Sequence, residues 1–382
     1  MDNLTHSLVG LAAAKAGLEK LSPGATVLCI LAANAPDVDV AVLIFRDRWS
    51  YLQHHRGLTH SIIGVSVLVF ALPLAFYFAD LLLARARTRR PVVRLGGLLL
   101  ASALTMTTHP ILDWTNNYGM RFLLPWSPRW SYGDFLFVID PVFWLVLGGS
   151  SFLLTANTKK QISAWLIIGL LTTALVMFGS LGANAPAVVT GFRVLWFAAL
   201  LTLAGLYRAK LGRHYGARLA ITGLVVVTVY SLALFTIHRV VWHRANVQAA
   251  EIARGHAEQI LQVAAMPTLA NPNDWLCILE TDRATYKFNV ALVGQSANAS
   301  IARFEKPSRR ESEIIAAAER DRRAQVFLGF ARFPGFRVIG EDCLSQTLVQ
   351  FADLRYTEPG KGRGTFSLEL PVDCPALERP TK

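Results

Sequence analysis

The stretch "SIIGVSVLVFALPLAFYFADLLLA", residues 61–84, decides the fold. It contains no basic residue and one carboxylate, Asp80. Crossing the roughly 30 Å hydrocarbon core of a bilayer takes about 20 predominantly apolar residues, and this stretch is longer than that. The segment therefore predicts a membrane-spanning helix.

Similar apolar segments lie on both sides of it. Four are long enough to span a membrane, and a fifth is interrupted only by Arg193: residues 93–112, 135–156, 161–182, 217–238 and 188–207. Residues 7–18 and 24–46 are predicted to form short, re-entrant helices, because the first is too short and "NAPDVD" (34–39) interrupts the second. Charged residues make up 17% of the chain, against about 25% in soluble domains. We therefore expect a polytopic α-helical membrane domain of about 6–8 hydrophobic helices.

The sequence changes character near residue 239. We predict a helical membrane domain over 1–238, a connecting amphipathic helix over 239–266, and a small α+β extramembrane domain over 267–382. "NPNDWLCILETDRATYKFNVALVG" (271–294) alternates like two strands with a turn at Asp282-Arg283. A charged helix is expected at 311–326, and strands at 345–355 and 364–371.

The charges indicate how the chain lies in the membrane. Residues 1–238 hold 19 Lys and Arg against 9 Asp and Glu, whereas residues 239–382 hold 19 against 17. Basic residues near membrane segments report topology, so this excess does not indicate nucleic-acid binding. The basic loops 85–94, 157–161 and 208–218 are predicted to be cytoplasmic, although Arg46, Arg48 and Arg56 fall on the opposite side. The C-terminal domain is then expected on the outer, periplasmic side of the inner membrane.

The four cysteines exclude a disulfide-rich scaffold and show no CxxC metal pattern. Cys29 lies in an apolar run. Cys277, Cys343 and Cys374 lie in the C-terminal domain, where one disulfide could form but cannot be assigned. No cleavable signal peptide is expected, because the short apolar stretch after His6 lacks a basic region before it.

Histidine and aspartate gather in the first part of the chain. Five of the nine histidines precede residue 110, and three aspartates accompany them: His6, His54, His55, His60, His109, Asp37, Asp39 and Asp113. Imidazole and carboxylate are ligands of zinc, manganese and iron. Ionisable residues inside a membrane segment are by default functional candidates. The set therefore predicts a metal site at one membrane face.

Spacing supports individual members of this set. His109 and Asp113 are four residues apart, so on a helix they share a face, unless Pro110 places His109 before the first turn. Asp37 and Asp39 either share a side of an extended turn or divide between the metal and its surroundings. Gly57 in "HHRGLTHS" (54–61) allows the chain to turn so that His54 or His55 joins His60. Taken singly, a histidine at the membrane interface is more often a hydrogen-bonded helix cap than a metal ligand.

One short phrase occurs twice, as "LTHSLVG" (4–10) and "LTHSIIG" (58–64). It is too short to be a structural repeat. We interpret it as one local solution used twice: a threonine that caps a helix, a histidine at the membrane face, and a glycine for close packing. His6, His60 and His109 are expected to face one another around one metal centre.

A polar and aromatic segment follows Asp113. Its members Asn116, Asn117, Tyr118 and Arg121 can donate hydrogen bonds to an anionic substrate, and Arg121 is suited to phosphate or carboxylate. Asp140, before Pro141, fits a helix cap as well as a catalytic role.

These motifs together resemble a known family. "MDNLTHSLVG", "AANAPDVDV", "HHRGLTHS", "THPILDWTNNYGMRFLLPWSPRW" and "FVIDP" are similar to the YdjM-like family of inner-membrane metal-dependent hydrolases, also described as LexA-binding. The resemblance is close over about residues 1–145 and looser beyond, where "NPNDW" and "DLRY" also look typical. The chain also has a more distant likeness to zinc-dependent phospholipase C proteins. His109 and Asp113 match the HxxxD pair of those proteins. LexA binding is not expected here, because the C-terminal domain is predicted outside the cytoplasm.

The resemblance and the residues together suggest a membrane-embedded metal-dependent hydrolase of an ester or phosphoester, with a small-molecule or lipid substrate. The expected metal ligands are His6, Asp37, His55, His60, His109 and Asp113, holding one or two divalent ions, most readily zinc, with manganese or iron as alternatives. Asp39 or His54 would act as general base and Arg121 would stabilise negative charge. The alternative is a non-catalytic membrane protein with a structural metal or polar cluster and a partner-binding C-terminal domain.

Overall fold

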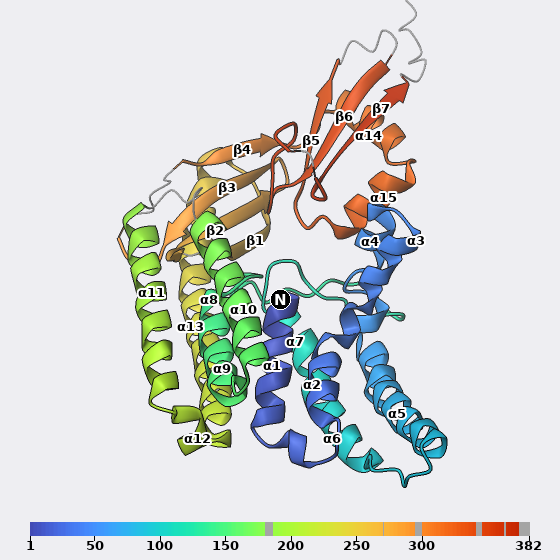
Figure 1. Ribbon diagram of the computed structural model, residues 1–382. Helices are drawn as coiled ribbons and strands as arrows, with labels where there is room; N and C mark the ends of the chain where they lie inside the picture. The colour runs from blue at the N-terminus through green and yellow to red at the C-terminus, as the bar shows by residue number, and fades with distance from the viewer. Residues whose placement is uncertain (180–185, 270, 295–299, 341–345, 363, 374–382) are drawn as a thin grey trace, which may run out of the picture. The chain divides into compact units, whose positions relative to one another are not determined.

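The computed structural model describes residues 1–179, 186–269, 271–294, 300–340, 346–362 and 364–373. These form two compact units (Figure 1). The first comprises Met1–Val38, Arg56–Arg239 and Met266–Asn273, and the second Asp39–His55, Val240–Ala265 and Asp274–Lys382. Cys343 and Cys374 lie outside the described residues, so the predicted disulfide alternatives stay predictions.

The first unit is helical. Its elements are α1 (Asn3–Lys15), η1 (Leu18–Lys20), α2 (Ala25–Asn34), η2 (Ala35–Ala41, which runs into the second unit), η3 (Leu58–His60), α5 (Ile62–Ala86), α6 (Leu95–Met106), α7 (Thr108–Trp114), α8 (Pro141–Phe143), the π-helix η4 (Trp144–Gly148), α9 (Gly149–Thr155), α10 (Lys159–Gly179), α11 (Pro186–Arg208), α12 (Leu211–Tyr215) and α13 (Ala217–His256), whose C-terminal part belongs to the second unit.

Within the described chain, six helical segments are long and apolar enough to cross a membrane: Ala25–Phe45, Ile62–Ala86, Leu95–Trp114, Lys159–Phe178, Val189–Arg208 and Ala217–His256. The polytopic helical fold is therefore confirmed. The segment expected at 135–156 is shorter, because helix begins only at Pro141, where Asp140 caps it by accepting from the Val142 amide. The stretch after Ala25 qualifies as a span, although η2 interrupts its α-helix.

At both copies of the repeated motif, a residue other than the threonine caps the helix. Asp2, and not Thr5, caps α1, because its carboxylate accepts from the Thr5 amide at 2.9 Å. Ser61, and not Thr59, caps α5. The threonine caps were therefore wrong. The glycine prediction is confirmed at Gly10, where a Cβ atom would lie 2.5 Å from the Cys29 carbonyl oxygen, so that α1 and α2 approach closely.

The second unit is α+β, as expected, but the connecting helix predicted over 239–266 is the end of α13, which stops at His256, and β1 already begins at Ile260. Two short helices, α3 (Val42–Phe45) and α4 (Arg48–His54), precede two sheets, one with strand order β1-β2-β3-β4 and one with order β5-β6-β7. The strands are β1 (Ile260–Thr268), β2 (Asn271–Thr281), β3 (Ala284–Ala291), β4 (Ala302–Glu305), β5 (Pro334–Ile339), β6 (Gln346–Asp353) and β7 (Ser367–Asp373). The ends of β1 and β2 around the bend between them, Met266–Asn273, belong to the first unit.

The hairpin predicted at Asp282-Arg283 is confirmed, because β2 and β3 pair antiparallel with Glu280 opposite Thr285. The single helix expected at 311–326 is instead two, α14 (Arg309–Ala318) and α15 (Arg322–Phe330). The break arises because the Asp321 side chain accepts from the Arg323 amide and starts a new helix.

Candidate metal centre

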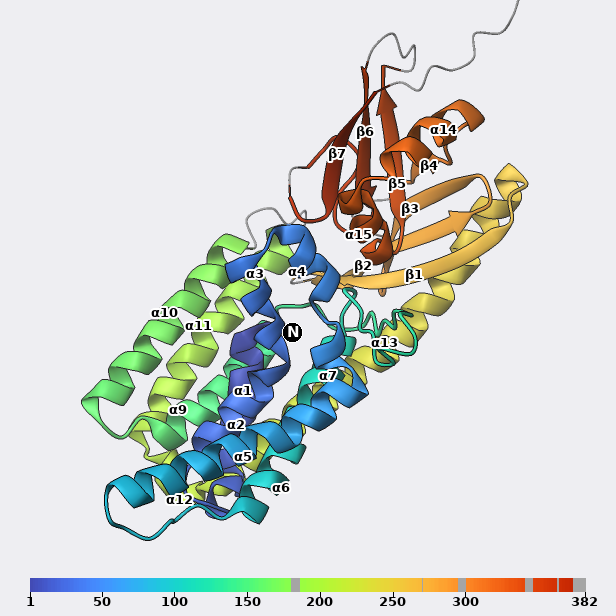
Figure 2. The same ribbon diagram turned by 90° about the vertical axis from the view of Figure 1, so that its right-hand side faces the viewer.

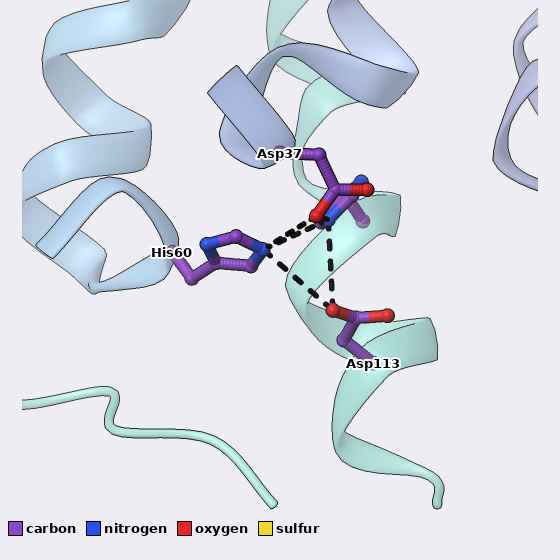
Figure 3. Close-up of side chains that lie close together, drawn as sticks. Asp37, His60 and Asp113 are labelled. Carbon is purple, nitrogen blue, oxygen red and sulfur yellow. Dashed lines mark hydrogen bonds and ion pairs between the residues drawn. The ribbon is translucent and has the colours of Figure 1, made fainter. Parts of the chain in front are cut away.

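Four side chains of the first unit converge on one point. Asp37, His60, His109 and Asp113 each offer one ligand atom, and these atoms all lie within 4.8 Å of one another. Figure 3 shows Asp37, His60 and Asp113 pointing toward a common centre from three separate segments. The imidazoles are fully buried, and the side chains of Asp37 and Asp113 are 12% and 2% exposed. The buried cluster could hold a metal ion.

The distances in this cluster match the edges of a coordination tetrahedron. Four ligands about 2.0–2.1 Å from a zinc ion would lie about 3.4 Å from one another. The His60 Nε2 atom is 3.2 Å from Asp37 Oδ1, 3.7 Å from Asp113 Oδ2 and 3.2 Å from His109 Nε2. The His109 Nε2 atom is 3.6 Å from both Asp37 Oδ1 and Asp113 Oδ2. Five of the six edges thus have the length that a tetrahedral ion requires.

The tautomer of His109 points to a cation. Its Nδ1 lies 2.7 Å from the Ala33 carbonyl oxygen. A carbonyl can only accept, so Nδ1 carries the proton and donates it. When the ring is neutral, its Nε2 atom then presents a lone pair to His60 and to two carboxylates. Such a gathering of acceptors is stabilised by a positive charge at its centre, and a backbone partner on the other ring nitrogen is typical of metal-bound histidine.

Local structure explains how these residues meet. Pro110 cannot donate to the carbonyl of Met106, so α6 ends there, and α7 starts at Thr108 with His109 and Asp113 one turn apart. Asp37 lies on the 3₁₀-helix η2, which makes a turn every three residues. Residues two apart then point in different directions, which separates Asp37 from Asp39.

His6 lies beside the four donors. Its ring stacks on His109 with a centroid distance of 3.8 Å, and its Nε2 atom is 3.2 Å from Asp113 Oδ1. The His60 and His109 rings meet edge to face at 5.0 Å. The three histidines of the Thr-His pairs are therefore neighbours, as predicted, and His6 contacts a carboxylate of the cluster.

Arg56 belongs to the same site, although the sequence suggested only a loop cation. It is 3% exposed, its Nε lies 2.9 Å from Asp113 Oδ2, and its Nη1 donates to Asn116 Oδ1 at 2.8 Å. Its φ of 50° is left-handed, a conformation uncommon for a residue with a side chain. The only available signal was its position between His55 and Gly57 in a motif that otherwise supplies site residues. The Met1 amino group also contacts Asp113 Oδ1.

The remaining predicted residues occupy other places. In the second unit, Asp39 pairs with His55 through Oδ1 and Nδ1 at 3.1 Å, and His54 is exposed at the end of α4. In the first unit, the Arg121 guanidinium stacks on the Trp130 ring at 4.5 Å. A ligand role for His55 and catalytic roles for Asp39, His54 and Arg121 stay predictions.

Comparison with known proteins supports the sequence motifs. Residues 1–184 match the family described as YdjM inner membrane protein. This match supports a YdjM-like family assignment for this part of the chain. All four donors of the candidate metal centre lie inside the match, together with Arg56 and four of the six candidate spans, which supports an inner-membrane protein.

A relative covers part of this region. The uncharacterized protein YfhP of Bacillus subtilis (strain 168) is 29% identical over 158 residues, which are 38% of this chain and 43% of YfhP. The chain thus spans less than half of that relative's length. No solved structure matches.

Proposed function

We propose that this chain is a membrane-embedded metal-dependent hydrolase that acts on an ester or phosphoester. The donor set carries the proposal. Structural zinc sites are built mainly from cysteine thiolates, often with histidine, whereas catalytic sites use histidine and carboxylate. The cluster of Asp37, His60, His109 and Asp113 is of the second kind. Zinc fits its distances most readily, with manganese or iron as alternatives.

The chain's own residues would perform three tasks. Asp37, His60, His109 and Asp113 would hold the ion, which supplies Lewis acidity and lowers the pKa of a water molecule that it binds. Arg56 would fix the orientation of the Asp113 carboxylate. His6, in contact with Asp113 Oδ1, is placed to hold a proton next to the site.

One observation favours a second function, a structural metal site in a non-catalytic membrane protein. Four buried donors are enough to complete a tetrahedral shell, and structural sites are closed in this way. Catalysis instead needs a further coordination position. Among the four donors, only Asp37 is exposed enough to leave a path from solvent to such a position, because the side chains of the other three are 2% exposed or less.

The site and the soluble domain would lie at the periplasmic side. This follows from the basic loops 85–94, 157–161 and 208–218, which we place in the cytoplasm, and it requires that the shorter apolar helix Pro141–Thr155 also crosses the membrane. A reporter fused after Lys382 should then show periplasmic activity, and a cytoplasmic signal would reverse the orientation. The substrate would be a small molecule or lipid that reaches the site from that side.

Hydrolysis provides the test. The full chain, purified in detergent and loaded with Zn²⁺ or Mn²⁺, is assayed with bis(p-nitrophenyl) phosphate and p-nitrophenyl butyrate. We expect metal-dependent turnover that is lost in His60→Ala and kept in His214→Ala, a histidine exposed on α12. Equal rates in wild type and His60→Ala would contradict the proposal.

Cobalt separates the two functions. The absorption spectrum of the Co²⁺-loaded chain should shift when inorganic phosphate is added if a coordination position is open. A bound cobalt whose spectrum ignores phosphate, together with no turnover, would establish the structural alternative.

A further inference from the structure

An apolar groove lies between helices of the first unit, away from the metal centre. It has a volume of about 430 Å³ and is formed by α1, η4, α9, α10 and α11. Figure 2 shows α10 and α11 side by side, and the Trp196 side chain of α11 contacts Thr173 of α10. Leu4 and Leu8 contribute the α1 side, and because His6 lies between them on the helix, it points to the opposite face. The volume falls within the usual range of ligand pockets, about 300–1,000 Å³.

The groove offers a ligand a mostly apolar surface. Its lining contains no charged residue, and its polar side chains are three tryptophans and two threonines. The Trp144, Trp165 and Trp196 Nε1 atoms donate to Asp2, Thr155 and Thr173. Thr172 and Thr173 donate to the carbonyls of Ile168 and Gly169. A hydrocarbon chain is therefore the complementary occupant.

The rim of the groove is set in membrane-spanning helices. Leu166, Leu170 and Phe197 line it and are themselves exposed on α10 and α11, both candidate spans. The medium around this rim is lipid, so an acyl chain can enter sideways.

A basic pocket continues the groove at one end. It has a volume of about 260 Å³ and is lined by Tyr207, Arg208, Lys210 and Arg213, among others, at the junction of α9, α11 and α12. The rings of Phe152 in the groove and Tyr207 in the pocket contact each other at a tilt of 35°, with centroids 5.0 Å apart. Phe152 and Ala204 of the groove also lie one helical turn before Ala156 and Arg208 of the pocket. The two cavities therefore adjoin.

The positive charge of the pocket favours binding of an anion. No Asp or Glu occurs in the sequence between Asp140 and Glu251. Arg208, Lys210 and Arg213 accordingly form no ion pair with any residue that the structure describes. Basic pockets between membrane helices on the cytoplasmic side bind anionic lipid headgroups. Gly212 is needed for this geometry, because a Cβ there would lie 1.9 Å from the Leu153 carbonyl oxygen.

We propose that groove and pocket form one binding site for an anionic glycerophospholipid, with an acyl chain between α1, α9, α10 and α11 and the headgroup phosphate on Arg208, Lys210 and Arg213. This site does not depend on the proposed hydrolase activity. The bound lipid would fix the packing of α10 and α11 against α1.

Native mass spectrometry of the delipidated full chain in detergent tests the proposal. It is titrated with phosphatidylglycerol or with zwitterionic phosphatidylethanolamine of the same acyl chains. The wild type should bind one phosphatidylglycerol in preference to phosphatidylethanolamine. Arg213→Ala should weaken phosphatidylglycerol binding about fivefold, the effect of one charge near lipid, and leave phosphatidylethanolamine binding unchanged. Arg90→Ala, an exposed arginine of another loop on the same side, is the matched control.

Filling the groove tests its apolar half. Gly169 lines it, and a Cβ there has no atom within 4 Å, so Gly169→Leu should occupy the space and abolish binding of both lipids. Gly205→Leu on α11 has equally open surroundings, lies outside both linings, and should bind like wild type. Wild-type binding by Gly169→Leu, or equal losses in Arg213→Ala and Arg90→Ala, would overturn the proposal.

A measurement without variants guards against misfolding. Phosphatidylglycerol with a diazirine in its acyl chain should label residues lining the groove on α9–α11 when irradiated with the wild-type chain. Labelling spread evenly to the exposed Val225 and Val229 of α13 would mean unspecific lipid contact and would also overturn the proposal.

Discussion

Both units bury carboxylates, but they compensate the charge differently. In the second unit Asp353 and Arg355 are fully buried together, with Nη2 to Oδ2 at 2.6 Å. In the first unit Asp37 and Asp113 face two imidazole Nε2 atoms, and the Arg56 guanidinium contacts Asp113 alone of the two. Asp353 thus has its counter-charge within the fold. Asp113 also has cations beside it, Arg56 and the Met1 amino group, but the contacts of Asp37 in the described chain are with the imidazoles of His60 and His109, and the cluster gathers four acceptor atoms around one point. The difference teaches that buried acids alone do not indicate a metal site; a surplus of acceptors does.

The largest effect is expected in the second unit. Asp353→Asn leaves the Arg355 charge buried and unpaired, which should cost about 3–5 kcal/mol of stability. Denaturant titration followed by labelling of Cys277, a fully buried thiol, measures this. Glu313→Gln, at an exposed ion pair, should change stability by less than about 1 kcal/mol. If Asp353→Asn lost bound metal while the first unit stayed folded, this distinction between the two units would be contradicted.

Metal removal should act on the first unit alone. An ion present at 100 to 1,000 times its dissociation constant stabilises the folded state by about 2.7–4.1 kcal/mol. A chelator should therefore increase labelling of Cys29, which lies on α2 and is buried against α1 and α6, and leave Cys277 protected. Equal exposure of both thiols would contradict the assignment of the ion to the first unit.

The sequence predicted much of this site because part of its geometry is local. His109 and Asp113 share a helix turn, and His60 directly precedes the helix of a long apolar run. Three other features of the molecule could be recognised only in the folded structure. The left-handed backbone that turns Arg56 inward has no signature in its residue type, the 3₁₀ geometry of η2 separates Asp37 from Asp39, and Asp2 displaces Thr5 as helix cap. In the second unit, the alternation of apolar and polar residues correctly predicted the β2–β3 hairpin. The break between α14 and α15 was missed because the helix cap at Asp321 was not recognised from the sequence.

A smaller effect should follow from Arg56. Partners of metal ligands typically contribute about 10–100-fold to metal affinity. Arg56→Gln should weaken metal binding by this factor because the Asp113 carboxylate loses its planar partner, and Arg56→Lys should lose nearly as much. Competition with a chromophoric chelator measures the affinity. Unchanged affinity in Arg56→Gln would show that Asp113 is oriented without it.

The smallest effect is a pH dependence in the second unit. Burial opposes ionisation of Glu258, but hydrogen bonds from Thr281, Arg303 and Tyr286 outweigh it and lower the pKa of this carboxyl. Its folded pKa is below the unfolded value of about 4.3, so its contribution is present above that pH and is lost as pH falls through the lowered pKa. Cys277 labelling should rise at acid pH in wild type, and Glu258→Gln should flatten that dependence. An identical acid profile in the variant would refute this assignment.

The most direct test of the metal centre is the metal content of the full chain purified in detergent. Wild type is compared with Asp113→Asn and with Asp80→Asn, a buried carboxylate of the first unit that is compensated by Arg89 and the amides of Val92 and Val93. We predict about one divalent ion per chain in wild type and Asp80→Asn, and background metal in Asp113→Asn. Background metal in all three proteins, or equal metal in all three, would contradict the account.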